Sequence, residues 1–128
     1  MTYTPEPAEL PGEYEQARDH ARVTVGPYAA EEQVTAASDL SLLHAEAFAL
    51  RLRADAAEDP PTLEEWGAHY RRKTPLLVRL SLSDPLSYEA PAREALARWR
   101  LAERREIAAL AGARLGDEAE GWLRQQGN

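Results

Sequence analysis

Glu103 is the residue whose type and position suggest unusual chemistry, because it interrupts an apolar helical face. Projecting residues 92–110 at about 100° per residue gathers five apolar side chains on one side of a helix: Ala92, Leu96, Trp99, Ile107 and Leu110. Glu103 falls in the middle of that side. Burial raises the pKa of a carboxyl group, and a buried carboxyl can act as an acid, a base or a ligand holder. The simpler interpretation is an internal ion pair, with Arg100 as the partner.

The three histidines, His20, His44 and His69, fall on three different predicted helices. A bundle can assemble a metal site from such residues when their side chains meet in its core. No two of them are three or four positions apart, and the His-Glu-x-x-His motif is absent. The sequence therefore predicts no metal site and no cofactor. His44 lies at the edge of an apolar stripe and joins Glu103 as a candidate buried polar or ligand-binding residue.

Aromatic and cationic residues are concentrated in one short segment, which contains Trp66, Tyr70, Arg71, Arg72 and Lys73. Aromatic and arginine side chains are enriched at protein interfaces, so this patch is the candidate partner-binding surface. The three cations also lie at the predicted end of a helix, where positive charge complements the helix dipole. Both interpretations remain open from the sequence.

Charge is segregated along the chain, whose formal net charge is −7. Residues 1–65 hold 14 acidic and 4 basic residues, whereas residues 66–116 hold 5 acidic and 10 basic ones. Either the basic half receives an acidic partner, or the two halves neutralise each other on folding. The net negative charge argues against general nucleic-acid binding, which depends on neutralising phosphates.

The segments that carry these residues have apolar positions at mostly helical spacing. A helix from Glu13 should end at Gly26-Pro27, and a second could follow from Pro27 to Ala57, either continuous or interrupted at Ser38-Asp39, which are both good N-cap types. Its better half, residues 39–57, carries a stripe with spacings of three and four, formed by Leu40, Leu43, Ala47, Leu50, Ala54 and Ala57. Three more apolar residues, Leu42, Phe48 and Leu52, lie off this stripe. We therefore expect this helix to be central in the bundle or to contribute to a subunit interface.

Thr62 and Glu65 form a capping box that predicts the start of the next helix, which Thr74-Pro75 should end. Residues 76–83 fit either a strand or a helical turn, so a short two-stranded ribbon of residues 22–25 with 77–82 stays open. Further helices are expected from Ala90 to Gly112 and over residues 117–126.

Together these patterns predict an all-α fold, a compact bundle of four or five helices. Residues 1–12 are expected to form an extended arm and residues 13–128 a single helical domain. The chain has no cysteine, no stretch long enough to span a membrane and no signal-peptide pattern at its start, so we expect a soluble cytoplasmic protein.

The absence of a catalytic constellation favours a binding or regulatory protein over an enzyme. Such a protein would act through its helical surfaces on a protein partner, with self-association as homodimers a further expectation. The alternative is an enzyme or small-ligand binder whose pocket between helices is organised by Glu103 and His44.

Overall fold

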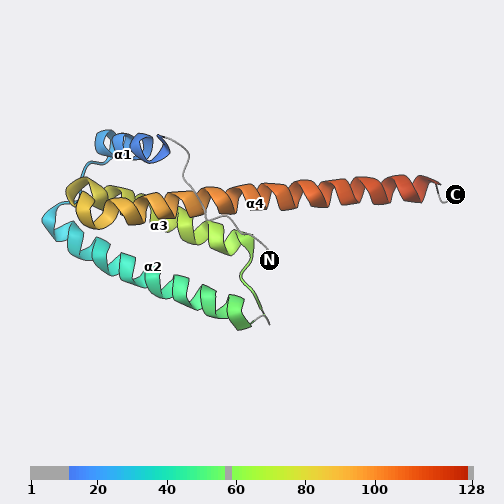
Figure 1. The fold of residues 1–128 in the computed structure, drawn as a ribbon, viewed down its shortest axis with the longest axis horizontal. Helices are drawn as coiled ribbons and strands as arrows, with labels where there is room; N and C mark the ends of the chain where they lie inside the picture. The colour runs from blue at the N-terminus through green and yellow to red at the C-terminus, as the bar shows by residue number, and fades with distance from the viewer. Residues whose placement is uncertain (1–11, 57–58, 127–128) are drawn as a thin grey trace, which may run out of the picture.

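The protein is described by a computed structural model that covers residues 12–56 and 59–126. Four helices account for most of these residues: α1 (Glu13–Thr24), α2 (Ala30–Ala56), α3 (Leu63–Ser83) and α4 (Pro85–Gln126). The described part of the chain contains no strand. The all-α bundle predicted from the sequence is therefore confirmed (Figure 1).

α3 is the central helix, because each of the other three packs against it. α3 and α4 form an antiparallel hairpin, and α1 and α2 lie on opposite sides of that hairpin (Figure 1). The prediction that the helix over residues 39–57 is central was wrong. Its stripe residues Leu40, Leu43, Ala47 and Leu50 are buried against the hairpin, while Leu42, Phe48 and Leu52 are exposed.

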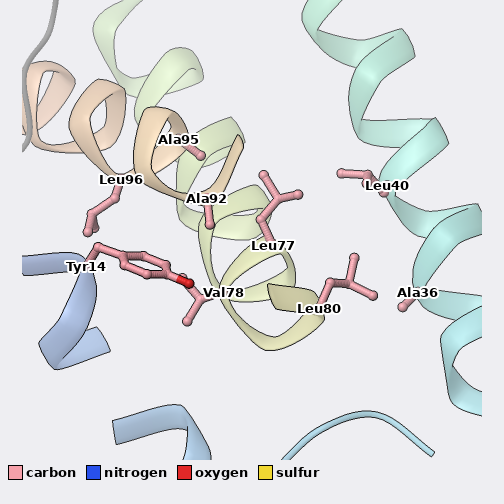
Figure 2. Close-up of a cluster of buried hydrophobic side chains, with 9 residues drawn as sticks. All are labelled: Tyr14, Ala36, Leu40, Leu77, Val78, Leu80, Ala92, Ala95 and Leu96. Atoms are coloured by element: carbon pink, nitrogen blue, oxygen red, sulfur yellow. The ribbon is translucent and has the colours of Figure 1, made fainter. Parts of the chain in front are cut away.

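The hydrophobic core lies where the other three helices pack against the C-terminal half of α3. Figure 2 shows Ala36 and Leu40 of α2 facing Leu77 and Leu80 of α3, with Tyr14 of α1 on the other side. Tyr14 is the buried residue of α1, and its hydroxyl lies 2.8 Å from the Ser81 hydroxyl of α3. The short α1 helix thus buries one large side chain whose polar end is satisfied.

Local signals define several helix ends as predicted. α1 ends at Thr24, and Gly26 follows with φ of 69°, a left-handed conformation that glycine adopts without strain. Arg79 of α3 holds this turn by donating from Nε to the Gly26 carbonyl at 2.8 Å. At the start of α3, Thr62 and Glu65 form the expected capping box.

The predicted break at Thr74-Pro75 does not occur, and the ribbon of residues 22–25 with 77–82 does not form. α3 continues through the exposed Pro75 to Ser83, and residues 22–24 are the last turn of α1. Leu77, Val78 and Leu80 are all buried between the neighbouring helices. In a helix these three side chains can contact several neighbouring helices at once. The free energy gained from their burial exceeds the loss of the one backbone hydrogen bond that Pro75 cannot donate.

α4 is a single helix of 42 residues where two shorter ones were predicted. It begins at Pro85, and the Asp84 side chain caps it by accepting a hydrogen bond from the Ser87 backbone nitrogen at 3.2 Å. Neither Gly112 nor Gly116 interrupts it, and its C-terminal half extends beyond the other three helices (Figure 1). α2 is likewise continuous through Ser38-Asp39.

The predicted N-terminal arm, residues 1–12, lies outside the described residues except for Gly12. Gly12 precedes α1 and adopts φ of 78°. Within the described ranges, no helix combines the length and apolar character needed to cross a membrane.

Candidate functional site

A pocket between α2, α3 and α4 brings together four of the residues singled out from the sequence: His44, Trp66, Tyr70 and Lys73. Its volume is about 410 Å³. The remaining lining residues are Ala47, Arg51, Leu77, Pro91, Glu94, Ala95 and Arg98. We call it the cationic pocket, because Arg51, Lys73 and Arg98 enter it from three different helices.

Helical spacing explains why each helix presents several side chains to this pocket. On α3, Trp66, Tyr70, Lys73 and Leu77 recur at intervals of four, three and four, which places them on one face. On α2, His44, Ala47 and Arg51 follow the same rule, and α4 contributes Pro91, Glu94, Ala95 and Arg98. The pocket is therefore a product of three aligned helix faces.

Positive charge is in excess within the cationic pocket. Arg98 pairs with Glu94, its Nε lying 3.1 Å from a carboxylate oxygen. Neither Arg51 nor Lys73 makes an ion pair or hydrogen bond among the described residues. Three cations thus face one carboxylate, and two positive charges remain without a counter-charge in the pocket wall.

Burial and neighbouring charges shift the pKa values of three residues that line the cationic pocket. Partial burial lowers the pKa of Lys73, and the nearby Arg51 and Arg98 lower it further, although Glu94 opposes them. The pKa of His44 is lowered by desolvation and by Lys73 and Arg51. Burial raises the pKa of Tyr70, whose ring stacks on that of Trp66 with centroids 6.1 Å apart. His44 and Tyr70 are consequently neutral at pH 7.

The other two cations of the predicted patch lie elsewhere. Arg71 is exposed on the surface of α3 and does not line the cationic pocket. Arg72 reaches α2, where its guanidinium pairs with Glu46. The residues singled out between Trp66 and Lys73 therefore do not form one surface. Trp66, Tyr70 and Lys73 line the cationic pocket, Arg71 faces solvent and Arg72 forms an ion pair with α2.

Glu46 also contacts His69, which the sequence did not single out for this role. His69 is fully buried, and its Nδ1 lies 3.1 Å from Oε1 of Glu46. Burial raises the Glu46 pKa, but hydrogen bonds from Arg72 and His69 hold it below its usual value. Desolvation lowers the pKa of His69. The available signal was the position of Glu46, three residues after Leu43 and four before Leu50, beside the buried stripe.

Glu103 lies at the edge of the α1–α4 contact. Its carboxylate accepts a hydrogen bond from Nη1 of Arg100 at 3.0 Å, and Arg100 also pairs with Glu13 of α1. About a third of the Glu103 side chain is exposed. The structure thus shows the ion pair with Arg100, and Glu103 lines neither the cationic pocket nor the larger groove described next. It does not bring Glu103 and His44 together.

A larger groove of about 810 Å³ opens between α1 and α2, with α3 and α4 beneath it. Its walls are mostly apolar, and Arg72 is the one residue of the predicted site set that lines it. Two lining residues, Thr74 and Trp99, have a buried polar atom with no hydrogen-bond partner among the described residues.

Ion pairs join the acidic half of the sequence, residues 1–65, to the basic half, residues 66–116. Glu13 and Glu15 of α1 pair with Arg100 and Arg93 of α4, and Glu46 pairs with Arg72. Two ion pairs with i,i+4 spacing also form within α4, Glu89 with Arg93 and Glu94 with Arg98. The halves therefore dock on each other at these contacts. Across the residues that the structure describes, no group of three metal-ligating side chains gathers.

Beyond the bundle, the end of α4 presents apolar side chains to solvent. We call residues 107–126 the projecting segment. Ile107, Leu110, Leu115 and Trp122 within it are 59–67% exposed. Ile107, Ala111 and Leu115 are four residues apart and Trp122 is seven further on, so these residues follow one side of the helix.

No protein-family model, curated protein or solved structure matches this chain.

Proposed function

We propose that this chain is a small cytoplasmic binding or regulatory protein that acts through helical surfaces and forms a homodimer through the projecting segment of α4. The observation that supports this most directly is the apolar side of that segment, where Ile107 is 66% and Leu115 is 65% exposed. Contiguous apolar surface of this kind is rare on monomeric proteins and is common at interfaces.

Helix stability gives a second reason for a partner. Residues 107–116 are all exposed, so tertiary packing within the chain contributes little to this part of α4. Isolated helices of about 12–15 residues are marginal in water, and most helical stability in proteins comes from packing of an apolar face. A second helix against this face would supply that packing.

The charge pattern of α4 favours an antiparallel partner of the same sequence. Arg104 and Arg105, between Glu103 and Glu106, lie seven and six residues before Ala111, and Asp117 and Glu118 lie six and seven residues after it. An antiparallel pairing centred near Ala111 would set Arg104 and Arg105 of one helix beside Glu118 and Asp117 of the other. A parallel pairing would set like charges together, which is unfavourable.

Sedimentation velocity tests the homodimer at micromolar protein concentration. The unmodified chain is expected to sediment as a dimer, and the double variant Ile107→Glu/Leu115→Glu as a monomer with unchanged helical circular dichroism. Leu86→Glu is the matched control, because Leu86 is 99% exposed on the same helix but lies outside the projecting segment. A monomeric unmodified chain would overturn the proposal.

Charge exchange tests the antiparallel arrangement. One variant carries Arg104→Glu and Arg105→Glu, and a second carries Asp117→Arg and Glu118→Arg. Each alone is expected to be monomeric, because both ends of its dimer would bring like charges together. An equimolar mixture should restore the dimer, since both ends are then complementary. Failure of the mixture to associate, with the unmodified chain dimeric, would exclude the antiparallel pairing.

A further inference from the structure

We propose that the cationic pocket between α2, α3 and α4 binds a phosphate dianion, either free phosphate or the terminal phosphate of a small organic molecule. This site is independent of the homodimer. None of its lining residues belongs to the projecting segment. Its size, about 410 Å³, falls within the range of small-ligand pockets.

Convergence of charge is the first argument. Arg51 on α2, Lys73 on α3 and Arg98 on α4 line one concavity, where Lys73 is partly buried and the two arginines are exposed. Glu94 balances one of these cations through its pair with Arg98. The two remaining positive charges match the charge of a phosphate dianion.

The second argument is that these cations destabilise the folded protein when no anion is bound between them. Lys73 is partly buried and has no ion pair or hydrogen bond among the described residues. Its pKa is lowered, chiefly by desolvation and further by Arg51 and Arg98. A cation kept in a partly buried place near two others destabilises the free protein, and a bound anion relieves the repulsion.

Donor geometry is the third argument. Arginine presents a planar fork of N–H donors that suits phosphate oxygens, and lysine adds a compact ammonium group. His44, which is neutral, and Tyr70 line the same pocket from α2 and α3 and can donate further hydrogen bonds. The stacked rings of Trp66 and Tyr70 line the pocket as well and are suited to the organic part of a phosphate ester.

The experiment is calorimetric titration of the full chain with inorganic phosphate and with phenyl phosphate, at constant ionic strength set by chloride. Saturable one-to-one binding of at least one probe is expected. Tighter binding of phenyl phosphate identifies an organic phosphate as the ligand class, and equal or tighter binding of inorganic phosphate identifies the free anion. Absence of saturable binding by both overturns the proposal.

Three variants locate the binding. Arg51→Gln and Lys73→Met should each weaken it about tenfold or more, the usual effect of removing one charged hydrogen bond. Arg71→Gln removes the same charge from α3 outside the pocket, and is expected to change the affinity by less than about twofold. Equal losses in Arg71→Gln and Lys73→Met would show unspecific attraction and overturn the site.

Stability separates a ligand site from a structural role for Lys73. Without phosphate, Lys73→Met should unfold at the same temperature as the unmodified chain or at a higher one, because it removes a partly buried charge. With saturating phosphate, only the unmodified chain should gain thermal stability. A variant that unfolds at a clearly lower temperature without phosphate would assign Lys73 to the fold and contradict the proposal.

Discussion

Nδ1 of the buried His69 lies 3.1 Å from Oε1 of Glu46, and this contact joins α3 to α2. α2 packs on α3 alone among the helices, so the pair sits in the interface that holds α2 in place. Arg72 binds the same carboxylate from the solvent side. One carboxylate thus satisfies a buried imidazole nitrogen and an exposed guanidinium.

Removal of the Glu46 carboxylate should destabilise the protein. Glu46→Ala leaves the buried Nδ1 of His69 without a partner, which is expected to cost about 1–3 kcal/mol in the free energy of unfolding. Chemical denaturation measures this directly. Glu46→Gln keeps an acceptor oxygen and should lose less, so equal losses in both variants would contradict the role given to this hydrogen bond.

His69 should make stability depend on pH below neutrality. Its pKa in the folded protein is lowered by desolvation, so the unfolded state binds a proton that the folded state does not. The free energy of unfolding therefore falls as pH drops below about 6.5. Melting temperatures between pH 7.5 and 5 should show this slope. His69→Phe should reduce the slope without abolishing it, because the pKa of His44 is lowered too.

Glu65 should contribute a second, more acidic dependence. Hydrogen bonds from Arg53 and from the Thr62 backbone lower its pKa to about 2. Because the folded-state pKa is depressed, the stabilisation is complete above pH 4.5 and is lost as pH falls toward 2. Glu65→Gln preserves the capping-box pattern but removes the charge. Its melting temperature should be lower than that of the unmodified chain at pH 7 and equal to it near pH 2, and a constant difference would contradict this linkage.

Tyr14 should decide whether α1 stays docked. Tyr14→Ala is expected to cost about 3–5 kcal/mol, the usual loss for a buried aromatic ring, and to increase hydrogen exchange in residues 13–24. Tyr14→Phe should cost only about 1 kcal/mol, because the Ser81 hydroxyl keeps its bond to the Val78 carbonyl. If Tyr14→Ala left exchange in α1 unchanged, other contacts would have to hold the helix.

Proline substitutions should have opposite effects at two positions. Pro75→Ala is expected to raise stability by about 1 kcal/mol or more, because it restores a backbone donor inside α3. Pro27→Ala lies in the turn after α1 and should lower stability by about 0.4–1 kcal/mol, through greater freedom of the unfolded chain. Denaturant midpoints compare the two, and a loss of stability in Pro75→Ala would show that the proline fits its helix without cost.

The sequence identified some of the residues of the candidate site, but it did not show that they line one pocket. The sequence singled out His44, Trp66, Tyr70 and Lys73, which line one pocket. It did not place Arg51 or Arg98 with them, because these cations come from two other helices whose rotations depend on packing. Arg71 and Arg72 adjoin Lys73 in sequence, yet successive residues on a helix point about 100° apart, so neither enters the pocket.

The sequence by itself determined the features that arise within one turn of helix: the capping box at Thr62, the left-handed Gly26 after α1 and the ion pair of Glu94 with Arg98. The capping box and the ion pair join groups three or four residues apart, and the turn at Gly26 depends on the conformational freedom of glycine itself, so a local sequence pattern is enough to predict them. Tertiary structure alone decided that α3 is central, that Pro75 lies inside a helix, and that Glu46 meets His69. These outcomes depend on the burial of side chains between segments that are far apart in the sequence. The free energy of that burial exceeds local helix preferences, and no residue pattern at a fixed spacing reveals it.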